Sequence, residues 1–476
     1  MRLLPRVVGD FVLIKFTLPS PTCPQLSIPV STGANEWIAA EILRDDFVHK
    51  ERLDGVVENT TELDDISEAT VELFARFLAF IADNIKPGTT CSSARTNVLL
   101  NAFEAFTTSY LSKKDLHGLA VSYDVDVRKS VISSYYRAQF ALKSQKVATI
   151  PVAPPSALLS AAADGNASVF ALFGGQGTNE VYFDELQALY DTYKPFVTSF
   201  LMDMTVNVLQ PLAASSPSSY FSYGLDVISW LAGAPRPPTE YLASIPVSFP
   251  LIGLTQLTQY IVSCQIAGLT PGDMRARLQG ATGHSQGIVS AVAIAASESF
   301  ESFSKNSAKA LKWLFFGGVR GQEAFPVLAV EPSIVADTME GGEGTPSPML
   351  SVQGLALADL EPHIKKTNKH LPANSQLSVS LYNGPKTFVV TGPAKSLYGL
   401  VTSLRKVRAP PGLDQSKTPY SQRKPVFSAR FLAVGVPYHS DYMNGATEKV
   451  MDDLKNEELW NSKDLAIPVY HTENGQ

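Results

Sequence analysis

The chain has 476 residues, 45% of them hydrophobic and 18% charged, so it is long and apolar enough to form two or three folded units. Its net charge of −6 and its pI near 5.7 argue against a nucleic-acid partner. No apolar run is expected to reach the roughly 18 to 20 residues of a membrane span, so no membrane partner is predicted.

Three cysteines, Cys23, Cys91 and Cys264, lie far apart in the sequence. Their number is odd, and their spacing shows none of the pairing that metal sites use. The sequence therefore predicts no metal site and a reducing, cytoplasmic location.

The N-terminal part is predicted to be mainly helical over residues 27–150, after a divergent segment at residues 1–26. Apolar side chains recur at helical spacing between residues 66 and 86, which predicts a helix there and a helical region that continues to about Lys146. The apolar positions are Val71, Phe74, Phe77, Leu78, Ile81 and Ile85.

Several stretches outside those helices have a distinct composition. The acidic stretch Asp45–Glu68 favours a solvated surface over a binding site. The proline-rich run Ile150–Ser156 predicts a linker. Beyond it, alternating strand and helix patterns predict an α/β core over residues 160–340, with a proline- and serine-rich surface loop at Pro211–Ser219.

A glycine loop follows the first strand expected in that core. The apolar run Ala167–Phe173 has the length and composition of a strand and ends at Gly174-Gly175-Gln176-Gly177. Such a loop can bring a backbone N–H close to a reacting carbonyl. A plain tight turn is the other interpretation of the same residues.

A second glycine-flanked motif, Gly283-His284-Ser285-Gln286-Gly287, fits the G-x-S-x-G pattern of a nucleophile turn. Small residues on both sides of Ser285 let the chain turn sharply from a strand into a helix and leave the serine exposed. The apolar run Ile288–Ala296 predicts the buried start of that helix, whose N-terminal amides favour negative charge beside the serine. An ordinary strand-to-helix turn is the alternative interpretation.

After residue 344 the pattern changes to that of a ferredoxin-like subdomain, assigned to residues 345–432. Strands and helices are expected in the order β-α-β-β-α-β. The expected elements are residues 349–352, 357–371, 377–381, 387–391, 394–407 and a strand within 426–432. Asn383-Gly384, between two alternating apolar runs, predicts a hairpin.

The last candidate is His439, in Pro437-Tyr438-His439-Ser440. A lone histidine in such an apolar setting is more often a core residue than a base. Residues 433–476 are predicted to return to the α/β core, which the sequence leaves incomplete at its C-terminus.

In this order the three motifs, F-G-G-Q-G, G-H-S-Q-G and P-Y-H-S, resemble those of the acyltransferase family that loads fatty-acid and polyketide synthases. Roughly residues 27–476 are similar to the N-terminal acetyltransferase region of the fungal fatty acid synthase β subunit. Stretches that carry this similarity are Ser244–Gly253, Leu314–Arg320, Gly344–Leu350 and Gly412–Ser416. The resemblance implies an α/β-hydrolase-like acyltransferase core with the ferredoxin-like subdomain inserted, preceded by the helical region.

The resemblance also implies roles for individual residues. Ser285 is the expected nucleophile and His439 its base. The backbone N–H groups of Gln286 and Gln176 are expected to form the oxyanion hole, and a backbone carbonyl near Thr472 to orient the histidine. The glycines of the loop that supports the site are Gly174, Gly175 and Gly177.

One further position bears on substrate choice. Relatives that accept malonyl groups carry an arginine in the helix after the nucleophile, where it pairs with the free carboxylate. The matching position here is Gly317, which favours a neutral acyl group and leaves more room than the aliphatic residue of fungal acetyltransferases. His284 is also assigned to substrate selectivity, whereas Arg320, one turn beyond Gly317, is not expected to bind the carboxylate.

The predicted activity is transfer of an acetyl or short neutral acyl group from coenzyme A, through an acyl-serine, to the phosphopantetheine thiol of an acyl carrier protein. No permanently bound cofactor is expected. The expected partners are acyl-CoA, the carrier protein and other fatty acid synthase subunits or domains. Seven basic residues between Arg405 and Arg430 could meet a coenzyme A or carrier phosphate, but a solvated connection is the favoured interpretation.

Two other classes of function stay open. A serine hydrolase shares G-x-S-x-G, but α/β hydrolases place an acidic residue between nucleophile and histidine in chain order and are not expected to carry a ferredoxin-like insertion. The second is a non-catalytic assembly module, because the sequence stops at Gln476, where relatives continue. A truncated sequence is the favoured explanation of that end.

Overall fold

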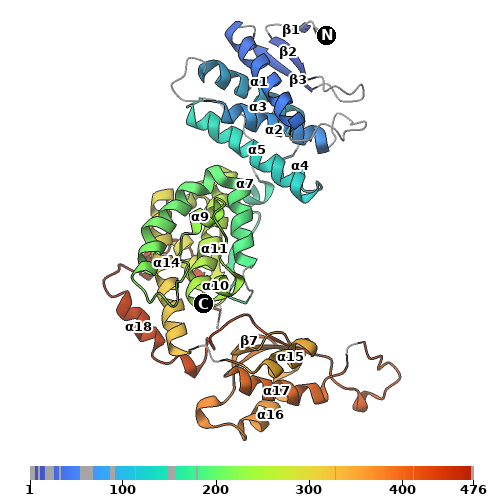
Figure 1. Ribbon diagram of the computed structural model, residues 1–476, viewed down its shortest axis with the longest axis vertical. Coiled ribbons are helices and arrows are strands. Elements are labelled where there is room, and N and C mark those ends of the chain that lie inside the picture. The colour runs from blue at the N-terminus through green and yellow to red at the C-terminus, as the bar shows by residue number, and fades with distance from the viewer. Residues whose placement is uncertain are drawn as a thin grey trace. The chain divides into compact units, whose positions relative to one another are not determined.

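The computed structural model divides into two compact units (Figure 1). The first unit comprises residues 1–167, 188–198 and 265–267, and the second comprises residues 168–187, 199–264 and 268–476. The residues that the structure describes are 6–8, 11–16, 26–31, 34–53, 68–85, 92–112, 114–147, 156–177, 181–326, 329–410 and 412–472.

The first unit has a three-stranded antiparallel sheet, in the order β1-β2-β3, followed by helices. Its elements are β1 (Arg6–Val8), β2 (Phe11–Phe16), β3 (Leu26–Ser31), α1 (Ala34–Leu53), α2 (Glu68–Asp83), α3 (Ser92–Tyr110), α4 (Leu116–Ala120), α5 (Val125–Ser144) and α6 (Ala157–Ala163). The predicted helical character is confirmed. The sequence does not predict the sheet, and it places the first helix near residue 66, whereas helices begin at Ala34.

Helix α2 confirms the apolar pattern predicted between residues 66 and 86. Val71, Phe74 and Leu78 are each at most 2% exposed. The ring of Phe74 meets the edge of Phe106 on α3 at a centroid distance of 5.3 Å. The apolar stripe is therefore the side of α2 that faces the core of the first unit.

The acidic stretch is only partly a solvated surface. Asp45 is exposed, but Glu51 near the end of α1 is 2% exposed, and its carboxylate lies 2.9 Å from the guanidinium of Arg76 on α2. Because a carboxylate is rarely buried unless it is paired, Glu51 joins the packing of α1 on α2. Residues 54–67 of this stretch, and residues 150–155 of the predicted linker, lie outside the described residues.

The second unit contains a three-stranded parallel sheet in the order β10-β5-β4. Its strands are β4 (Phe170–Phe173), β5 (Gly280–Gly283) and β10 (Val469–Tyr470). Its helices are α7 (Val181–Met204, partly in the first unit), η1 (Thr205–Leu209), α8 (Gln210–Ala214), α9 (Val227–Leu231), α10 (Thr239–Ala243), α11 (Ile245–Ala267), α12 (Pro271–Arg275), α13 (Gly287–Ala295), α14 (Phe300–Ala324), α15 (Pro332–Glu340) and α18 (Ala446–Asp453).

The alternation of strands and helices confirms the predicted α/β core. The surface loop predicted at residues 211–219 is wrong in its first half, because α8 continues through Ala214. Pro211 lies in the first turn of α8, which continues directly from the π-helical segment η1.

Helix α11 corrects the expectation that no apolar segment reaches the length of a membrane span. It has 23 residues, and a window of 18 residues has a mean hydropathy of 1.2. Within the structure, 94% of that window is buried. A helix that is apolar on all sides and covered by protein has the burial of a central core helix.

The ferredoxin-like subdomain is confirmed. Its four strands are antiparallel and lie in the order β7-β8-β6-β9. The elements are β6 (Met349–Gln353), α16 (Leu357–Asn368), β7 (Ser378–Gly384), β8 (Thr387–Thr391), α17 (Ala394–Val407) and β9 (Ser428–Phe431), with short 3₁₀ turns at Ala373–Ser375 and Tyr420–Gln422. Two further 3₁₀ turns, Asp441–Met443 and Ser462–Asp464, follow the subdomain. Asn383-Gly384 ends β7, so the hairpin turn itself is Pro385-Lys386.

The two faces of the subdomain sheet pack against different parts of the second unit. One face buries apolar side chains together with those of α16 and α17. The other face places Met349 and Val389 in a cluster with Ile245, Val434 and Val436 of the α/β core. This second cluster seats the subdomain on the core.

Two arginines of the basic stretch have structural partners. The side chain of Glu343 is fully buried and lies 3.0 Å from the guanidinium of Arg408. It also pairs with Arg405, which reaches Asp337 at 2.7 Å. Because a buried carboxylate needs such charge partners, Arg405 and Arg408 are not free to meet a ligand phosphate.

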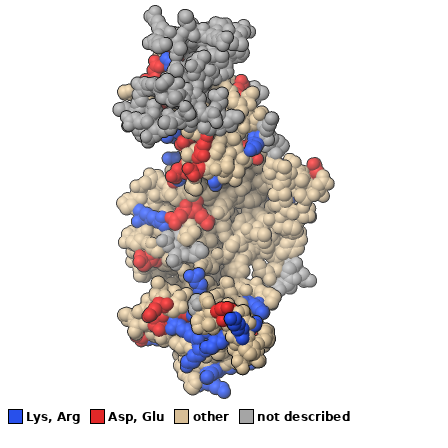
Figure 2. All heavy atoms as spheres, turned by 90° about the vertical axis from the view of Figure 1, so that its right-hand side faces the viewer, with Lys and Arg blue, Asp and Glu red and all other residues tan. Residues whose placement is uncertain are grey.

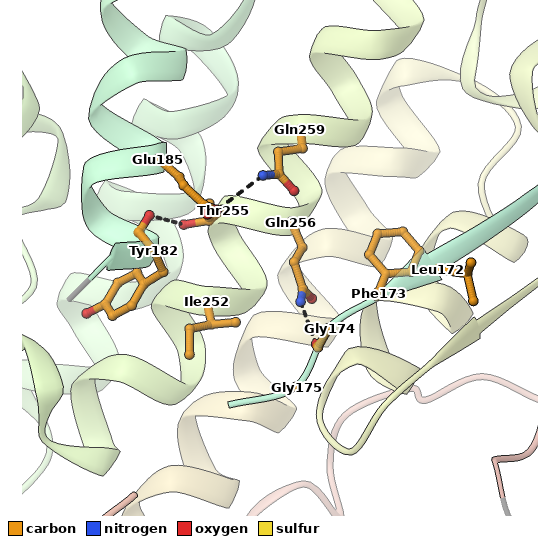
Figure 3. Close-up of a pocket in the computed structure, with 10 residues that line it drawn as sticks. All are labelled: Leu172, Phe173, Gly174, Gly175, Tyr182, Glu185, Ile252, Thr255, Gln256 and Gln259. Carbon is orange, nitrogen blue, oxygen red and sulfur yellow. Dashed lines mark hydrogen bonds between the residues drawn. The ribbon is translucent and has the colours of Figure 1, made fainter. Parts of the chain in front are cut away.

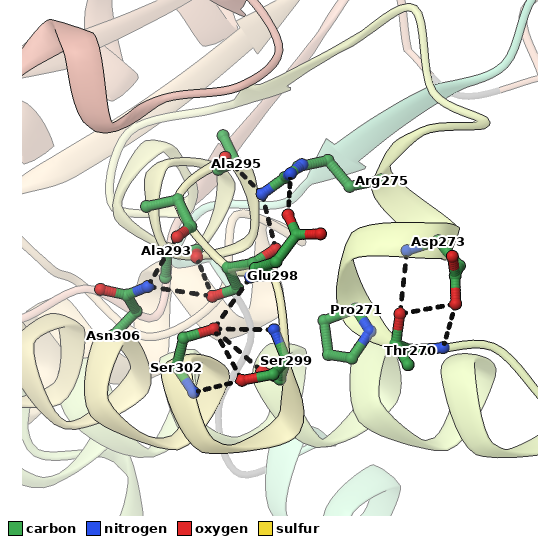
Figure 4. A network of polar contacts seen from close by, with 12 residues as sticks. Thr270, Pro271, Asp273, Arg275, Ala293, Ala295, Glu298, Ser299, Ser302 and Asn306 are labelled. Carbon is green, nitrogen blue, oxygen red and sulfur yellow. Dashed lines mark hydrogen bonds and ion pairs between the residues drawn. The ribbon is translucent and has the colours of Figure 1, made fainter.

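Helix α13 is fastened at its C-terminal end by a network of polar contacts (Figure 4). Arg275 on α12 donates to the carbonyl of Ser297 at 2.7 Å and pairs with Glu298. Asn306 on α14 donates to the carbonyl of Ala296 at 3.0 Å. These contacts join α12, α13 and α14, so they fix the helix that begins beside Ser285.

Candidate active site

Ser285 lies in a sharp turn between β5 and α13, with a φ of 52°. Residues other than glycine rarely adopt this left-handed backbone conformation, so the turn holds Ser285 under strain. A Cβ on Gly283 would lie 2.0 Å from the carbonyl carbon of Gly287, and a Cβ on Gly287 would lie 2.5 Å from the carbonyl oxygen of Gly174. Both glycines are therefore required by contact with the main chain.

The glycine loop approaches this turn closely at one position. A Cβ on Gly175 would lie 2.9 Å from the carbonyl oxygen of His284 and 3.2 Å from Cβ of Ser285. By contrast, a Cβ on Gly174 or Gly177 would meet nothing within 4 Å. Close approach therefore explains Gly175 but neither of the other two predicted loop glycines.

The structure brings Ser285 and His439 together. Ser285 Oγ lies 2.9 Å from Nε2 of His439, although 154 positions separate them in the sequence. The φ of His439 is 61°, so it too adopts the left-handed conformation. Burial lowers the pKa of His439, and the nearby His284 lowers it further. A neutral imidazole is thus favoured, and it can accept the serine proton.

Of the two glutamines predicted for the oxyanion hole, Gln286 follows Ser285 directly and Gln176 follows Gly175, the loop residue that approaches the serine. The side chain of Gln176 donates to Oγ of Ser248 at 2.6 Å, and that of Gln286 donates to the carbonyl of Phe249 at 3.3 Å. Both side chains are thereby held by α11. Within the described part of the chain, no protein group accepts a hydrogen bond from the backbone N–H of either glutamine.

His284 connects the nucleophile turn to the ferredoxin-like subdomain. Its side chain is exposed, and its Nε2 lies 3.2 Å from Oδ1 of Asn383 at the end of β7. Asn383 is predicted from the sequence only as part of a hairpin. Its contact with His284 depends on how the subdomain is seated, which no local pattern reveals.

Gly317 lies on α14 beside two aromatic side chains. Its Cβ, if present, would lie 3.2 Å from Cε1 of Phe249 and 3.6 Å from Cζ3 of Trp313. Phe249 stacks on Tyr438 at a centroid distance of 5.2 Å, and the Tyr438 hydroxyl donates to the Gly317 carbonyl at 3.3 Å. The expectation of open space at Gly317 is therefore wrong, because the Phe249 ring occupies it.

Arg320 is engaged elsewhere. Its guanidinium makes two parallel contacts with the carboxylate of Asp453 on α18, at 2.7 and 2.8 Å, and a third with Glu323 at 2.9 Å. A bidentate pair of this kind is strong and specific. This agrees with the expectation that Arg320 does not bind a substrate carboxylate.

Thr472 gains no support as the group that orients His439. It is exposed, two residues after the end of β10, and no hydrogen bond joins it to His439 within residues 412–472. The strand does reach the nucleophile strand, because Thr282 Oγ1 on β5 donates to the carbonyl of Tyr470 at 2.8 Å.

A pocket of about 230 Å³ is lined in part by the glycine loop (Figure 3). Gly174, Gly175 and Gln256 are among its lining residues, whereas Ser285 and His439 are not. In Figure 3, the Gln256 amide donates to the carbonyl of Gly174 at 2.7 Å. The Gln256 side chain thus holds the loop, and the candidate residues Ser285 and His439 are not part of the pocket lining. No group of three or more metal-ligating side chains occurs in the residues that the structure describes.

Comparison with known proteins shows the family of the chain. Residues 171–424, more than half of the chain, match the family described as "Starter unit:ACP transacylase in aflatoxin biosynthesis". Residues 22–142 match the N-terminal domain in fatty acid synthase subunit beta, a match that begins slightly before the predicted residue 27.

The chain is 41% identical over 440 residues to the fatty acid synthase subunit beta of Saccharomyces cerevisiae and 39% identical over 458 residues to that of Schizosaccharomyces pombe. These alignments cover 90% and 95% of this chain and 21% of each relative, so the chain spans about a fifth of their length. A solved type II polyketide synthase acyl-carrier protein in complex with its malonyl-transacylase aligns at 18% identity and a TM-score of 0.40, over 65% of this chain and 76% of that chain. From the match over residues 171–424, the chain belongs to the starter unit:ACP transacylase family.

Proposed function

We propose that this chain moves an acetyl or short neutral acyl group from coenzyme A, through an ester on Ser285, to the phosphopantetheine thiol of an acyl carrier protein. The observation that carries the proposal is the 2.9 Å contact between Ser285 Oγ and His439 Nε2 at a strained turn. The serine hydroxyl holds its proton too tightly to be a good nucleophile toward a thioester. A neutral histidine at this distance is placed to take that proton.

The first half-reaction follows from these contacts. As Ser285 Oγ attacks the thioester carbonyl, its proton passes to Nε2 of His439. The oxyanion that develops meets the backbone N–H groups of Gln176 and Gln286 and the N-terminus of α13, whose dipole favours negative charge. The carbon–sulfur bond then breaks, and His439 returns the proton to the departing thiolate of coenzyme A.

The second half-reaction reverses these roles. His439 takes the proton of the carrier thiol, the thiolate attacks the Ser285 ester, and the carbon–oxygen bond breaks as the proton returns to the serine. Coenzyme A is thus a substrate, and the chain's own residues perform both steps without a permanently bound cofactor. We also assign the other synthase subunits or domains as partners and the cytoplasm as the location.

We assign the domains on the same basis. Residues 160–340 and 433–476 form the acyltransferase core and residues 345–432 its ferredoxin-like subdomain. Residues 27–150 form the helical N-terminal region. The boundary that the sequence places at residues 26 and 27 falls within β3, whose pairing with β2 joins residues 1–26 to the same unit.

Selectivity for a neutral acyl group rests on α14. The sequence of α14 contains one arginine, Arg320, and its guanidinium is occupied by Asp453 and Glu323. Near Gly317 lie the rings of Phe249 and Trp313, and the Tyr438 hydroxyl donates to the Gly317 carbonyl. The free carboxylate of a malonyl group placed beside Gly317 would have no charge partner there, which disfavours malonyl groups.

The test is intact-protein mass spectrometry after mixing with acetyl-CoA. The protein should gain the mass of one acetyl group, and a labelled peptide should contain Ser285. Ser285→Ala should show no adduct, whereas the control Ser218→Ala, at an exposed serine of the same unit, should acetylate normally. An adduct on any other residue contradicts the proposal, and release to water as fast as to an added thiol indicates a hydrolase instead.

A further inference from the structure

The segment between α17 and β9, here named the basic loop (residues 412–426), projects from the ferredoxin-like subdomain. It carries Lys417, Arg423 and Lys424 against the single acid Asp414. Almost all of its residues are exposed, including three large apolar side chains. Their exposed fractions are 50% for Leu413, 89% for Tyr420 and 75% for Val426. Single exposed apolar residues are ordinary, but three on one basic loop need an explanation.

The loop is braced by its own residues. The amide of Gln415 donates to the carbonyl of Lys424 at 3.0 Å and accepts from the N–H of Lys424 at 2.7 Å. Arg423 donates to the carbonyls of Thr418 at 2.9 Å and Ser416 at 3.1 Å. A loop held in one shape by such bonds loses little entropy when it binds, and compact surface loops of this kind are frequently functional.

Because of these internal bonds, some charged side chains of the loop are occupied and others are not. The guanidinium of Arg423 is used within the loop, and the carboxylate of Asp414 accepts from the N–H of Ser416 at 2.8 Å. Within the described residues, no ion pair engages the ammonium groups of Lys417 and Lys424. Arg423 keeps its positive charge, but its donors are used within the loop, so the two lysines are the cations that can reach a partner directly. Figure 2 shows Lys and Arg side chains gathered on the subdomain surface.

The basic loop joins β9 at one end of the subdomain sheet, and that same end of the sheet contacts the candidate active site. Across the strands, Ser428 of β9 pairs with Gln353, Gln353 with Thr387, and Thr387 with Gly384. Asn383, next to Gly384, contacts His284 beside the nucleophile. A partner held on the basic loop thus sits at the end of the subdomain that borders the Ser285 turn.

The shape of the loop selects the kind of partner. A small molecule is bound in a concave site, whereas this loop protrudes and encloses nothing. A permanent protein interface is large and mainly apolar, whereas here one aromatic ring stands among cations. We propose that the basic loop docks the acidic surface of the acyl carrier protein, with Tyr420 as the anchor and Lys417 and Lys424 as the attracting charges. The inference rests on the proposed transfer to a carrier, which must arrive and leave in each cycle.

The test separates docking from chemistry by using two acceptors. The acetylated full chain is mixed with a holo-acyl carrier protein domain of a fungal fatty acid synthase or with free pantetheine. Tyr420→Ala and the double variant Lys417→Ala/Lys424→Ala should each raise the KM for the carrier about tenfold, as expected when an interface anchor is lost. Loading from acetyl-CoA and transfer to pantetheine should stay within about twofold, because neither uses the docking contact.

The matched control removes the same charge from another surface of the subdomain. Lys366 and Lys369 are exposed on α16 and at its C-terminal end, so Lys366→Ala/Lys369→Ala should leave the carrier KM within about twofold. Higher salt should raise the carrier KM of the unmodified chain and have less effect on the lysine variant.

Three results overturn the inference: an unchanged carrier KM in both loop variants, an equal loss with pantetheine, or an equal loss in the α16 control. Failure of the proposed function is recognised separately, because it abolishes acetylation of Ser285 in the unmodified chain. In that case a binding titration of the holo-carrier against the Ser285→Ala chain and its loop variants, which needs no turnover, still decides whether the loop docks the carrier.

Discussion

The nucleophile turn and the Gly317 side of α14 both depend on glycine, but an added side chain would meet different atoms in each. At Gly283 and Gly287 it would meet main-chain atoms at 2.0 and 2.5 Å. At Gly317 it would meet the edge of the Phe249 ring at 3.2 Å. Main-chain atoms cannot yield without moving β4 or α13, whereas a ring can turn. We therefore expect the backbone to set the geometry at Ser285, and side chains near Gly317 to adjust the proposed substrate range.

The largest expected effect tests the first half of this comparison. Gly283→Ala forces a methyl group into the main chain of the turn, so we expect no detectable acetyl adduct and a melting temperature lowered by at least several degrees. Gly174→Ala is the control in the adjoining loop, since its methyl would meet nothing within 4 Å. Mass spectrometry and thermal unfolding give both readouts, and a normal adduct in Gly283→Ala would refute the claim that the backbone leaves no room.

Removal of the base should have the next largest effect. His439→Ala leaves the Ser285 turn and the oxyanion donors in place, so acetylation should slow by about 10²- to 10⁴-fold rather than vanish. Rapid-quench kinetics with acetyl-CoA measure the rate, and circular dichroism checks the fold. A rate within about tenfold of the unmodified chain would exclude His439 as the base.

Substrate range tests the side-chain half of the comparison. Malonyl-CoA should load at least about 100-fold more slowly than acetyl-CoA, because an unpaired buried carboxylate costs several kcal/mol. Gly317→Ala pushes on the Phe249 ring, so the ratio of hexanoyl to acetyl loading should fall several-fold with the acetyl rate nearly unchanged.

Specificity constants for the three thioesters measure both effects. Gly399→Ala on α17 is the matched control, since its methyl would make only an ordinary contact with Thr367 at 3.5 Å. Efficient malonyl loading by the unmodified chain would show that its carboxylate has another partner.

The smallest expected effect concerns pH. Only neutral His439 accepts the serine proton, and burial together with His284 lowers its pKa. The loading rate should therefore rise with pH and level off at a lower pH than an ordinary histidine, with a pKa of about 6.5, would give. His284→Gln removes the smaller of the two causes, so the rising limb should move to higher pH by less than about one unit. A shift to lower pH would contradict this assignment.

Local patterns predict the regular parts of this molecule well. The bounds of β8 and α17 agree with the sequence prediction. A short apolar run between two threonines marks β8, and apolar residues at helical spacing mark α17. The start of the helical region is misplaced because α1 is rich in charge, and the burial of Glu51 depends on Arg76, 25 residues away. Periodicity carries no information about such a partner.

In the candidate site, too, local patterns predict some features, and contacts between distant residues determine the others. Ser285 and its flanking glycines are predicted because the turn imposes its own residue types. Phe249 is one of many buried residues of α11, and its stacking on Tyr438 joins residues far apart in the sequence. Contacts of this kind arise only from the packing of α11 and α14 with the segment that carries His439.

The two residues proposed for the chemistry both have an unfavourable left-handed backbone conformation, with φ angles of 52° at Ser285 and 61° at His439. Each such angle in a residue other than glycine costs on the order of 1–3 kcal/mol. A glycine at position 285 would relieve part of that cost and destroy the nucleophile, so Ser285→Gly should unfold at a higher temperature than the active chain. A search for heat-resistant variants that ignores acyl transfer would therefore enrich inactive proteins, and the site persists only under selection for what it does.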